Sequence, residues 1–114
     1  IVLMSGAMNG AFDTTERNIT FDDDAASQIP QNTRPAGVDH TFKPAAYEVA
    51  SFPSPAPSNS SEPFYDGAAP YYVSGLSAFN GENPNGAWSL WIYDDLSLNN
   101  GYCLHGWDLN ITTA

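Results

Sequence analysis

Two groups of aspartates have the residue types and spacing of a cation-binding site. Three consecutive aspartates at 22–24 and a pair at 94–95 each follow a short apolar-alternating segment. Adjacent carboxylates repel by about 1 kcal/mol at about 4 Å in water, and a hard cation converts that repulsion into binding. Calcium takes about six to eight oxygen ligands, including amide oxygens. The sequence therefore predicts a calcium site. Its predicted ligands are Asp22, Asp23, Asp24, Asp94, Asp95 and Asn99.

Each acidic group also has a purely structural interpretation. Residues 22–24 precede Ala25 and Ala26, and acids in a first helical turn are favoured by the helix dipole. The pair at 94–95 fits a solvated turn. The spacing is not that of an EF-hand loop, so calcium binding and a structural role both remain open.

Motifs for other chemistry are not evident in the sequence. The segment 75–79 lacks the second glycine of a nucleophile elbow, and the zincin, phosphate-loop and Cys-x-x-Cys patterns are missing. His40 and His105 are isolated and are interpreted as ordinary polar residues. The chain is therefore predicted not to be an enzyme. Cys103 has no intrachain partner; it is predicted to be a buried small residue, with an intermolecular bridge as the alternative.

Charge and composition indicate a secreted domain with a protein or cation partner. Three basic residues face thirteen acids, for a net charge of −10, which disfavours nucleic acid and anionic membranes. No apolar run is long enough to cross a bilayer. Few lysines and arginines, with many small polar residues, are typical of extracellular surfaces. Three sequons predict glycosylation, at Asn18, Asn59 and Asn110.

The elements that would position these residues are predicted to be strands within one domain, 1–114. Its 114 residues, 42% hydrophobic, suit a single core. Residues 1–4 form an apolar run, and 17–21 alternate in polarity, so both are predicted strands. Residues 22–27 are predicted to begin a short helix. Residues 30–70 hold eight of nine prolines and are predicted to be a long irregular connection.

The C-terminal part carries the clearest strand pattern. Residues 87–93 alternate with apolar side chains on both faces, and residues 104–112 alternate between an apolar and a polar face. Asn99-Asn100-Gly101 between them is a hairpin-type turn. Together these features predict an antiparallel hairpin in an all-β domain, a β-sandwich or jelly roll.

The segment 79–95 resembles the signature of a known protein family, the bacterial P (Homo B) domains. It reads Phe79-Asn80-Gly81-Glu82-Asn83-Pro84-Asn85-Gly86-Ala87-Trp88-Ser89-Leu90-Trp91-Ile92-Tyr93-Asp94-Asp95. The segments 3–5, 20–25, 52–57 and 101–109 are similar to further segments of that family, in the same order, although Tyr102-Cys103 adds a residue after Gly101. The resemblance implies an antiparallel jelly-roll-like sandwich. It also implies a non-catalytic role beside a subtilisin-like protease or other hydrolase, and calcium binding in some members.

One departure from the family suggests how the chain would meet a partner. Family members have strands before the segment matching residues 3–5, and the chain begins at Ile1 without them. We therefore expect an exposed sheet edge that a neighbouring domain or another copy of the chain completes. Strand exchange from head to tail would give an extracellular filament. A carbohydrate-binding module is a further alternative, with Tyr71, Tyr72, Trp91 and Tyr93 stacking on sugars if they are exposed.

Overall fold

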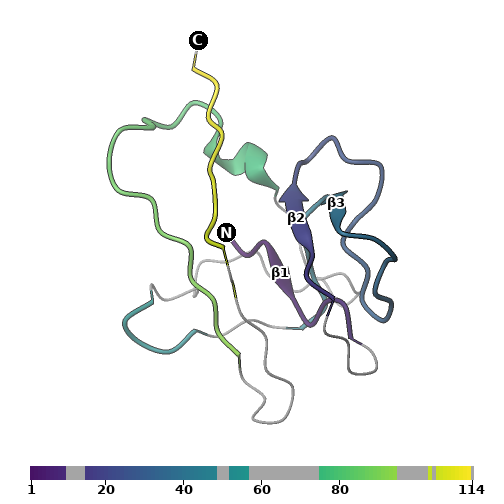
Figure 1. Cartoon of the computed structure of the whole chain (residues 1–114). Helices are drawn as coiled ribbons and strands as arrows, with labels where there is room; N and C mark the ends of the chain where they lie inside the picture. Colours follow the sequence, from purple (N-terminus) through teal and green to yellow (C-terminus); the bar gives the residue numbers. More distant parts are fainter. Residues whose placement is uncertain (10–14, 49–51, 57–74, 95–102, 104, 114) are drawn as a thin grey trace. The chain divides into compact units, whose positions relative to one another are not determined.

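The fold is seen in a computed structural model of the whole chain (Figure 1). The structure describes residues 1–9, 15–48, 52–56, 75–94, 103 and 105–113. These residues fall into two compact units, residues 1–80 and residues 81–114, and each unit is described by itself. Within the described ranges the only helical element is a 3-10 helix, so the protein is all-β in character. None of its described helices is long and apolar enough to cross a membrane.

The first unit contains two short parallel ladders. Strand β2 (Asn18–Phe21) pairs with β3 (Asp39–Phe42), from Asn18 opposite Asp39 to Phe21 opposite Phe42, and the two lie side by side in Figure 1. Strand β1 (Met4–Ser5) pairs with β4 (Ala45–Ala46). Both described ladders are parallel, whereas the sequence predicted antiparallel pairing. The long connection between β2 and β3 permits this, because parallel neighbours need a crossover.

The segment 39–47 organises the first unit, although the sequence predicted an irregular connection there. Its backbone pairs in turn with residues 18–21, with Gln28 and with residues 4–5. Beyond β3, the amide of Lys43 donates to Ser27 and its carbonyl oxygen accepts from Ile29. Pro44 has no N–H to donate, and the strand divides there into β3 and β4.

A small core lies against this segment. Ile29 and Ala45 are fully buried and Phe42 nearly so, and partly buried apolar side chains pack around them. These surrounding residues are Ala7, Met8, Ile19, Phe21 and Tyr47. The hydroxyl of Tyr47 donates to the carbonyl oxygen of Ile29 (2.7 Å), which satisfies a polar group beside the core. The predicted half-buried strand at 17–21 is confirmed, since Ile19 and Phe21 are its inner residues.

Residues 22–27 form a turn rather than the predicted helix start. The Oδ1 atom of Asp22 accepts the amide N–H of Asp24 (2.8 Å), and the carbonyl oxygen of Asp22 accepts the N–H of Ala25 (3.1 Å). An aspartate that bonds the backbone two residues ahead favours a turn over a helix. The chain then pairs with Lys43 at Gln28 instead of continuing helically.

The second unit differs most from the sequence prediction. No strand is assigned to residues 85–94 or 105–113, which cover most of the two strands predicted there. The predicted turn at 99–101 lies outside the described residues. Polarity alternation shows that a segment suits a sheet, but a strand also needs a hydrogen-bonded neighbour. The described part of this unit contains no such ladder.

Candidate functional site

The acidic turn at 22–24 is built at the end of β2, and Asp23 is its central residue. Its carboxylate receives two backbone N–H groups from the 3-10 helix η1 (Leu76–Phe79): Leu76 donates to Oδ1 (2.8 Å) and Ser77 to Oδ2 (2.7 Å). A 3-10 helix leaves its first N–H groups without helical partners, and a carboxylate satisfies them well. Asp23 therefore ties the end of β2 to a helix 53 residues further along the chain.

Gly75 allows this close approach. A Cβ atom added at Gly75 would overlap the carboxylate group of Asp23. Its backbone is extended, with φ of −99°, so the glycine is needed for space rather than for a left-handed conformation. The helix begins directly after this residue, which lets Asp23 reach the first two helical amides.

The electrostatics of Asp23 favour its charged form. Partial burial raises the pKa of Asp23, but hydrogen bonds from the Ser77 and Leu76 amides and the Ser77 hydroxyl, with the charge of Lys43, together outweigh it. The net pKa lies below its ordinary value of 3.8. Hydrogen bonds to a carboxylate stabilise the ion relative to the acid. Asp23 is thus an anion whose two oxygens each accept a backbone hydrogen bond from η1.

The predicted calcium ligands are not assembled by the described residues. Asp22 and Asp24 are exposed, Asp22 Oδ1 accepts the Asp24 amide, and Asp23 binds η1. Asp94 is exposed in the second unit, while Asp95 and Asn99 lie outside the described residues. Across the described ranges no three histidine, cysteine or acidic side chains form a group able to hold a metal. The calcium site therefore stays a prediction.

Of the three predicted sequons, two fall on described residues. Asn18 is exposed on β2, and its Nδ2 donates to Oδ1 of Asp39 on the neighbouring strand (2.7 Å). Asn110 is exposed in the second unit, and Asn59 lies outside the described residues. Both described asparagines have the outward orientation that glycosylation requires, and modification itself stays a prediction.

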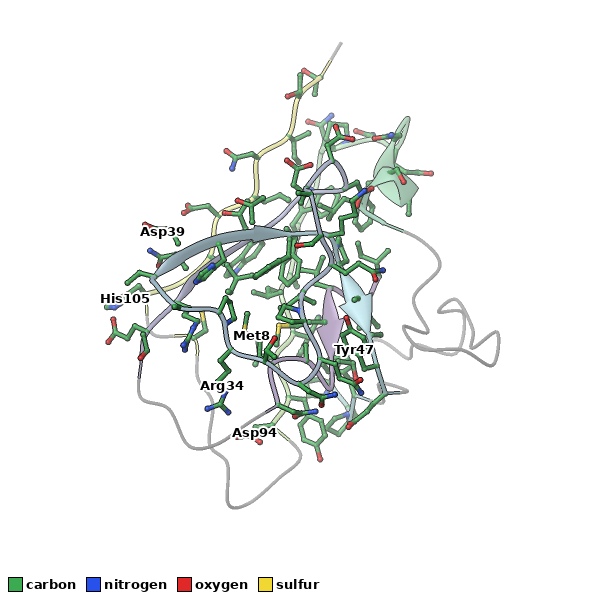
Figure 2. All side chains as sticks on the ribbon, turned by 90° about the vertical axis from the view of Figure 1, so that its right-hand side faces the viewer. Met8, Arg34, Asp39, Tyr47, Asp94 and His105 are labelled. Carbon is green, nitrogen blue, oxygen red and sulfur yellow. The ribbon has the colours of Figure 1, made fainter. Side chains whose placement is uncertain are left out.

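His40 and Arg34 are held by local contacts, whereas Cys103 departs from its prediction. His40 stacks on Phe42, with ring centroids 5.8 Å apart, and its Nε2 lies 3.1 Å from the carbonyl oxygen of Gly37. Arg34 donates from Nε to the carbonyl oxygen of Met8 (2.9 Å), and the two residues lie together in Figure 2. Cys103 is exposed, so its predicted burial was wrong. Its Sγ lies 3.2 Å from the carbonyl oxygen of Gly106.

The second unit holds a different kind of candidate site, which we call the exposed apolar segments, residues 90–93 and 107–111. Large apolar side chains there are 38–60% exposed. They are Leu90, Trp91, Ile92, Tyr93, Trp107, Leu109 and Ile111. The sequence predicted strands here, and polarity alternation alone does not distinguish a core face from a binding face.

A turn precedes the first exposed apolar segment and fixes the start of it. Asn83 Oδ1 accepts the amide N–H of Asn85 (3.0 Å), and Gly86 has φ of 132°, which favours glycine. Four residues after Pro84, the indole of Trp88 donates to the carbonyl oxygen of Pro84 (3.0 Å). The Asn-Pro-Asn-Gly sequence thus forms a turn to which the indole of Trp88 is hydrogen-bonded, and residues 90–93 follow directly after it.

Two features stand out among the residues that the structure describes. They are a carboxylate engaged in structure and a row of exposed apolar side chains. The resemblance to P domains depends on the sequence segments alone. Comparison with models of known protein families, with curated proteins and with solved structures gave no match.

Proposed function

We propose that this chain is a non-catalytic, secreted β module with a structural or assembly role, which acts by contact with another polypeptide. The observation that carries the proposal is the exposure of the apolar segments at 90–93 and 107–111. Fully burying one large apolar side chain contributes about 1.5–3 kcal/mol. Soluble proteins that expose many such side chains usually cover them in a complex.

Charge narrows the kind of partner. Residues 81–114 contain Glu82, Asp94, Asp95 and Asp108 and no lysine or arginine. Nucleic acids and anionic membranes need cationic contacts, so they are unsuitable partners for this surface. A protein surface with an apolar centre suits it better, because interface cores are apolar and poor in charge.

The finer features of the fold belong to the same proposal. The P-domain-like sequence motifs support a β-sandwich of jelly-roll type, in which the module would stabilise a neighbouring protease or hydrolase domain, although both described ladders are parallel. Such domains are usually attached parts of larger secreted proteins. A protein-binding surface on the second unit is what an attached module would need.

Carbohydrate binding is the second candidate, because Trp91 is 42% exposed and Tyr93 52% exposed. Exposed aromatic rings can stack on the apolar faces of sugars. The neighbouring Leu90 and Ile92 are aliphatic and also exposed, by 38% and 60%. This favours a protein partner, since sugar platforms gain little from aliphatic side chains. Titration with soluble oligosaccharides separates the candidates: a saturable change in tryptophan fluorescence would establish sugar binding.

We expect the isolated chain to bind the neutral dye Nile red through the exposed apolar segments. A neutral dye is chosen because an anionic dye would be repelled by a net charge of −10. Replacing Leu90 and Ile92 by serine should remove most of the dye fluorescence, because it removes two exposed apolar side chains from one segment. The measurement is a fluorescence titration on dilute protein.

Leu3→Ser is the matched control, because Leu3 is an aliphatic residue in the other unit and only partly exposed. It should leave dye binding almost unchanged. Wild-type protein that binds no dye would contradict the proposal, since the apolar side chains would then be covered within the chain itself.

Calcium binding remains part of the proposal only if residues beyond the described aspartates contribute ligands. We expect calcium to raise the midpoint of thermal unfolding relative to a chelator, by an amount equivalent to about 2.7 kcal/mol at a hundredfold excess over the dissociation constant. Differential scanning calorimetry measures the shift. Magnesium is the control, because it requires tighter octahedral geometry and should stabilise less. Superimposable curves in calcium and chelator would show that no folded-state calcium site exists.

A further inference from the structure

We propose that a second copy of this chain is a partner, and that residues 87–93 of one copy add as an antiparallel strand to the free edge of β2 in the next. This inference rests on the proposed assembly role and specifies its partner and geometry. As far as the structure describes it, the chain carries both halves of the contact: a sheet edge in the first unit that no described strand pairs with, and an exposed, strand-like segment in the second.

The acceptor is the edge of β2 that faces away from β3. Asn18 and Asp22 donate their amides to Val38 and Phe42 on the β3 side. Backbone groups alternate between the two edges of a strand, so those of Ile19 and Phe21 point to the other edge. No strand pairs with that edge among the residues that the structure describes. On the opposite side of this ladder, the chain is paired just beyond β3, where Lys43 bonds Ser27 and Ile29.

An open edge of this kind is a template for another strand. Its unpaired N–H and C=O groups lose hydrogen bonds to water when covered, and an added strand restores them. The side chains of Ile19 and Phe21 pack on the buried cluster. They hold β2 in place, so the accepting edge is preformed and β2 itself loses little conformational entropy when a strand is added.

The donor is the segment Ala87–Tyr93. Aromatic and β-branched residues favour strands, and this segment contains two tryptophans, an isoleucine and a tyrosine. Leu90, Trp91 and Ile92 are exposed, and no strand is assigned to them. Pairing with an edge would place residues 90–92 in a ladder, which their sequence suits.

Charge decides the orientation. Three aspartates follow β2 at 22–24, while Glu16 and Arg17 before it balance each other. In an antiparallel pair, we take the register in which Trp91 lies opposite Ile19. The numbers of any two residues that lie opposite each other then add up to about 110. Asp94 then lies opposite Glu16 and beside Arg17, and uncharged Ala87 lies opposite Asp23. A parallel pair in the same register would set Asp94 opposite Asp22, where like charges repel.

Two consequences follow from one copy giving a strand and the next receiving it. The contact is heterologous, so it repeats from head to tail and does not stop at a dimer.

Each copy also carries a charge of −10, so the copies repel at low ionic strength. The screening length falls to about 10 Å at 0.1 M salt. Assembly should therefore strengthen as salt is added, whereas binding to a basic partner would weaken.

The test is particle mass by light scattering across a range of protein concentrations, at low and high salt, in chelator. The expected result is a mass that rises with both concentration and salt and passes beyond two chains. Trp91→Pro should reduce the assembled fraction at least tenfold, because proline cannot donate to a ladder. Leu109→Pro is the matched control: Leu109 is 43% exposed, in the same unit, and also outside any assigned strand. It should assemble like the wild type.

The orientation has its own pair of variants. At high salt, where the net charge of the copies is screened, Ala87→Lys places a cation opposite the three aspartates in the antiparallel arrangement. It should strengthen assembly more than Asp94→Lys, whose new cation lies opposite Glu16 but beside Arg17. The opposite ranking would overturn the antiparallel geometry.

Failure of this inference differs from failure of the proposed function. A chain that stays monomeric at every concentration, stops at two copies, or assembles equally well with Trp91→Pro overturns the head-to-tail contact. The same chain can still bind Nile red through its exposed apolar segments, and the proposed docking role then stands without a second copy as partner.

Discussion

Replacing Ile29 by alanine is expected to lower the free energy of unfolding by about 2–5 kcal/mol, the range for deleting a buried aliphatic side chain. Ile29 is the only large side chain that is fully buried among the described residues, with 0% exposure. It packs with Phe42 and Ala45, and its carbonyl oxygen accepts the Tyr47 hydroxyl. A core this small has few other side chains that can move into the cavity, so little of the loss is recovered.

Ile92→Ala is the matched control for this prediction. Ile92 has the same side chain but is 60% exposed, and surface truncations usually change stability by less than about 0.5 kcal/mol. Urea unfolding should be followed by far-ultraviolet circular dichroism, because all three tryptophans lie in residues 81–114 and their fluorescence reports the other unit. Equal losses in the two variants would show that the core is not centred on Ile29.

The sequence predicted part of the first unit because part of its order is local. Ile19 and Phe21 alternate with polar neighbours, and this pattern alone identifies β2. Strand β3 has the same pattern, in His40 and Phe42, but it is short and lies among prolines, which favoured an irregular connection. The parallel ladders join residues that are far apart in the sequence, and such pairing leaves no local signal.

The C-terminal segments show a second limit of predicting strands from polarity alternation. Leu90, Ile92 and Leu109 occupy strand-like patterns, yet they are exposed and lie in no assigned strand. A pattern records which side chains would be covered together, but not which neighbour covers them. When the neighbour is another polypeptide, the same pattern gives a binding segment.

The aspartates at 22–24 show that a sequence identifies candidate side chains but not the residues that they contact. The sequence predicted that the three aspartates begin a helix, whereas they lie in a turn, and it could not show that Asp23 would meet Leu76 and Ser77. That contact spans more than 50 residues. The one available signal was Gly75, whose missing side chain leaves room for the carboxylate; a single glycine does not identify its neighbour.

Removing the Asp23 carboxylate is expected to detach η1 from the end of β2. Asp23→Ala should lower the free energy of unfolding at neutral pH by about 1–2 kcal/mol. Hydrogen bonds to charged groups contribute about 1.5–3 kcal/mol when sheltered, and less for a side chain this accessible to solvent. Hydrogen exchange at the Leu76 and Ser77 amides should accelerate. Asp24→Asn is the control, because Asp24 is adjacent and exposed and its side chain makes no hydrogen bond within the described ranges. Unchanged exchange in Asp23→Ala would contradict the tie.

The pH dependence of this contact has a definite sign. Burial raises the pKa of Asp23, but its hydrogen bonds and Lys43 hold the folded-state value below the ordinary 3.8. The unfolded chain therefore binds the proton first, and the stabilising contribution is present above pH 3.8 and lost as the pH falls through the folded-state pKa. The stability difference between wild type and Asp23→Asn should be constant near neutrality and shrink in acid below about pH 4. Urea midpoints measured stepwise through that range test it: a difference that grows in acid would mean that Asp23 is bound as the neutral acid, and its contact with η1 could not then be the charged one described above.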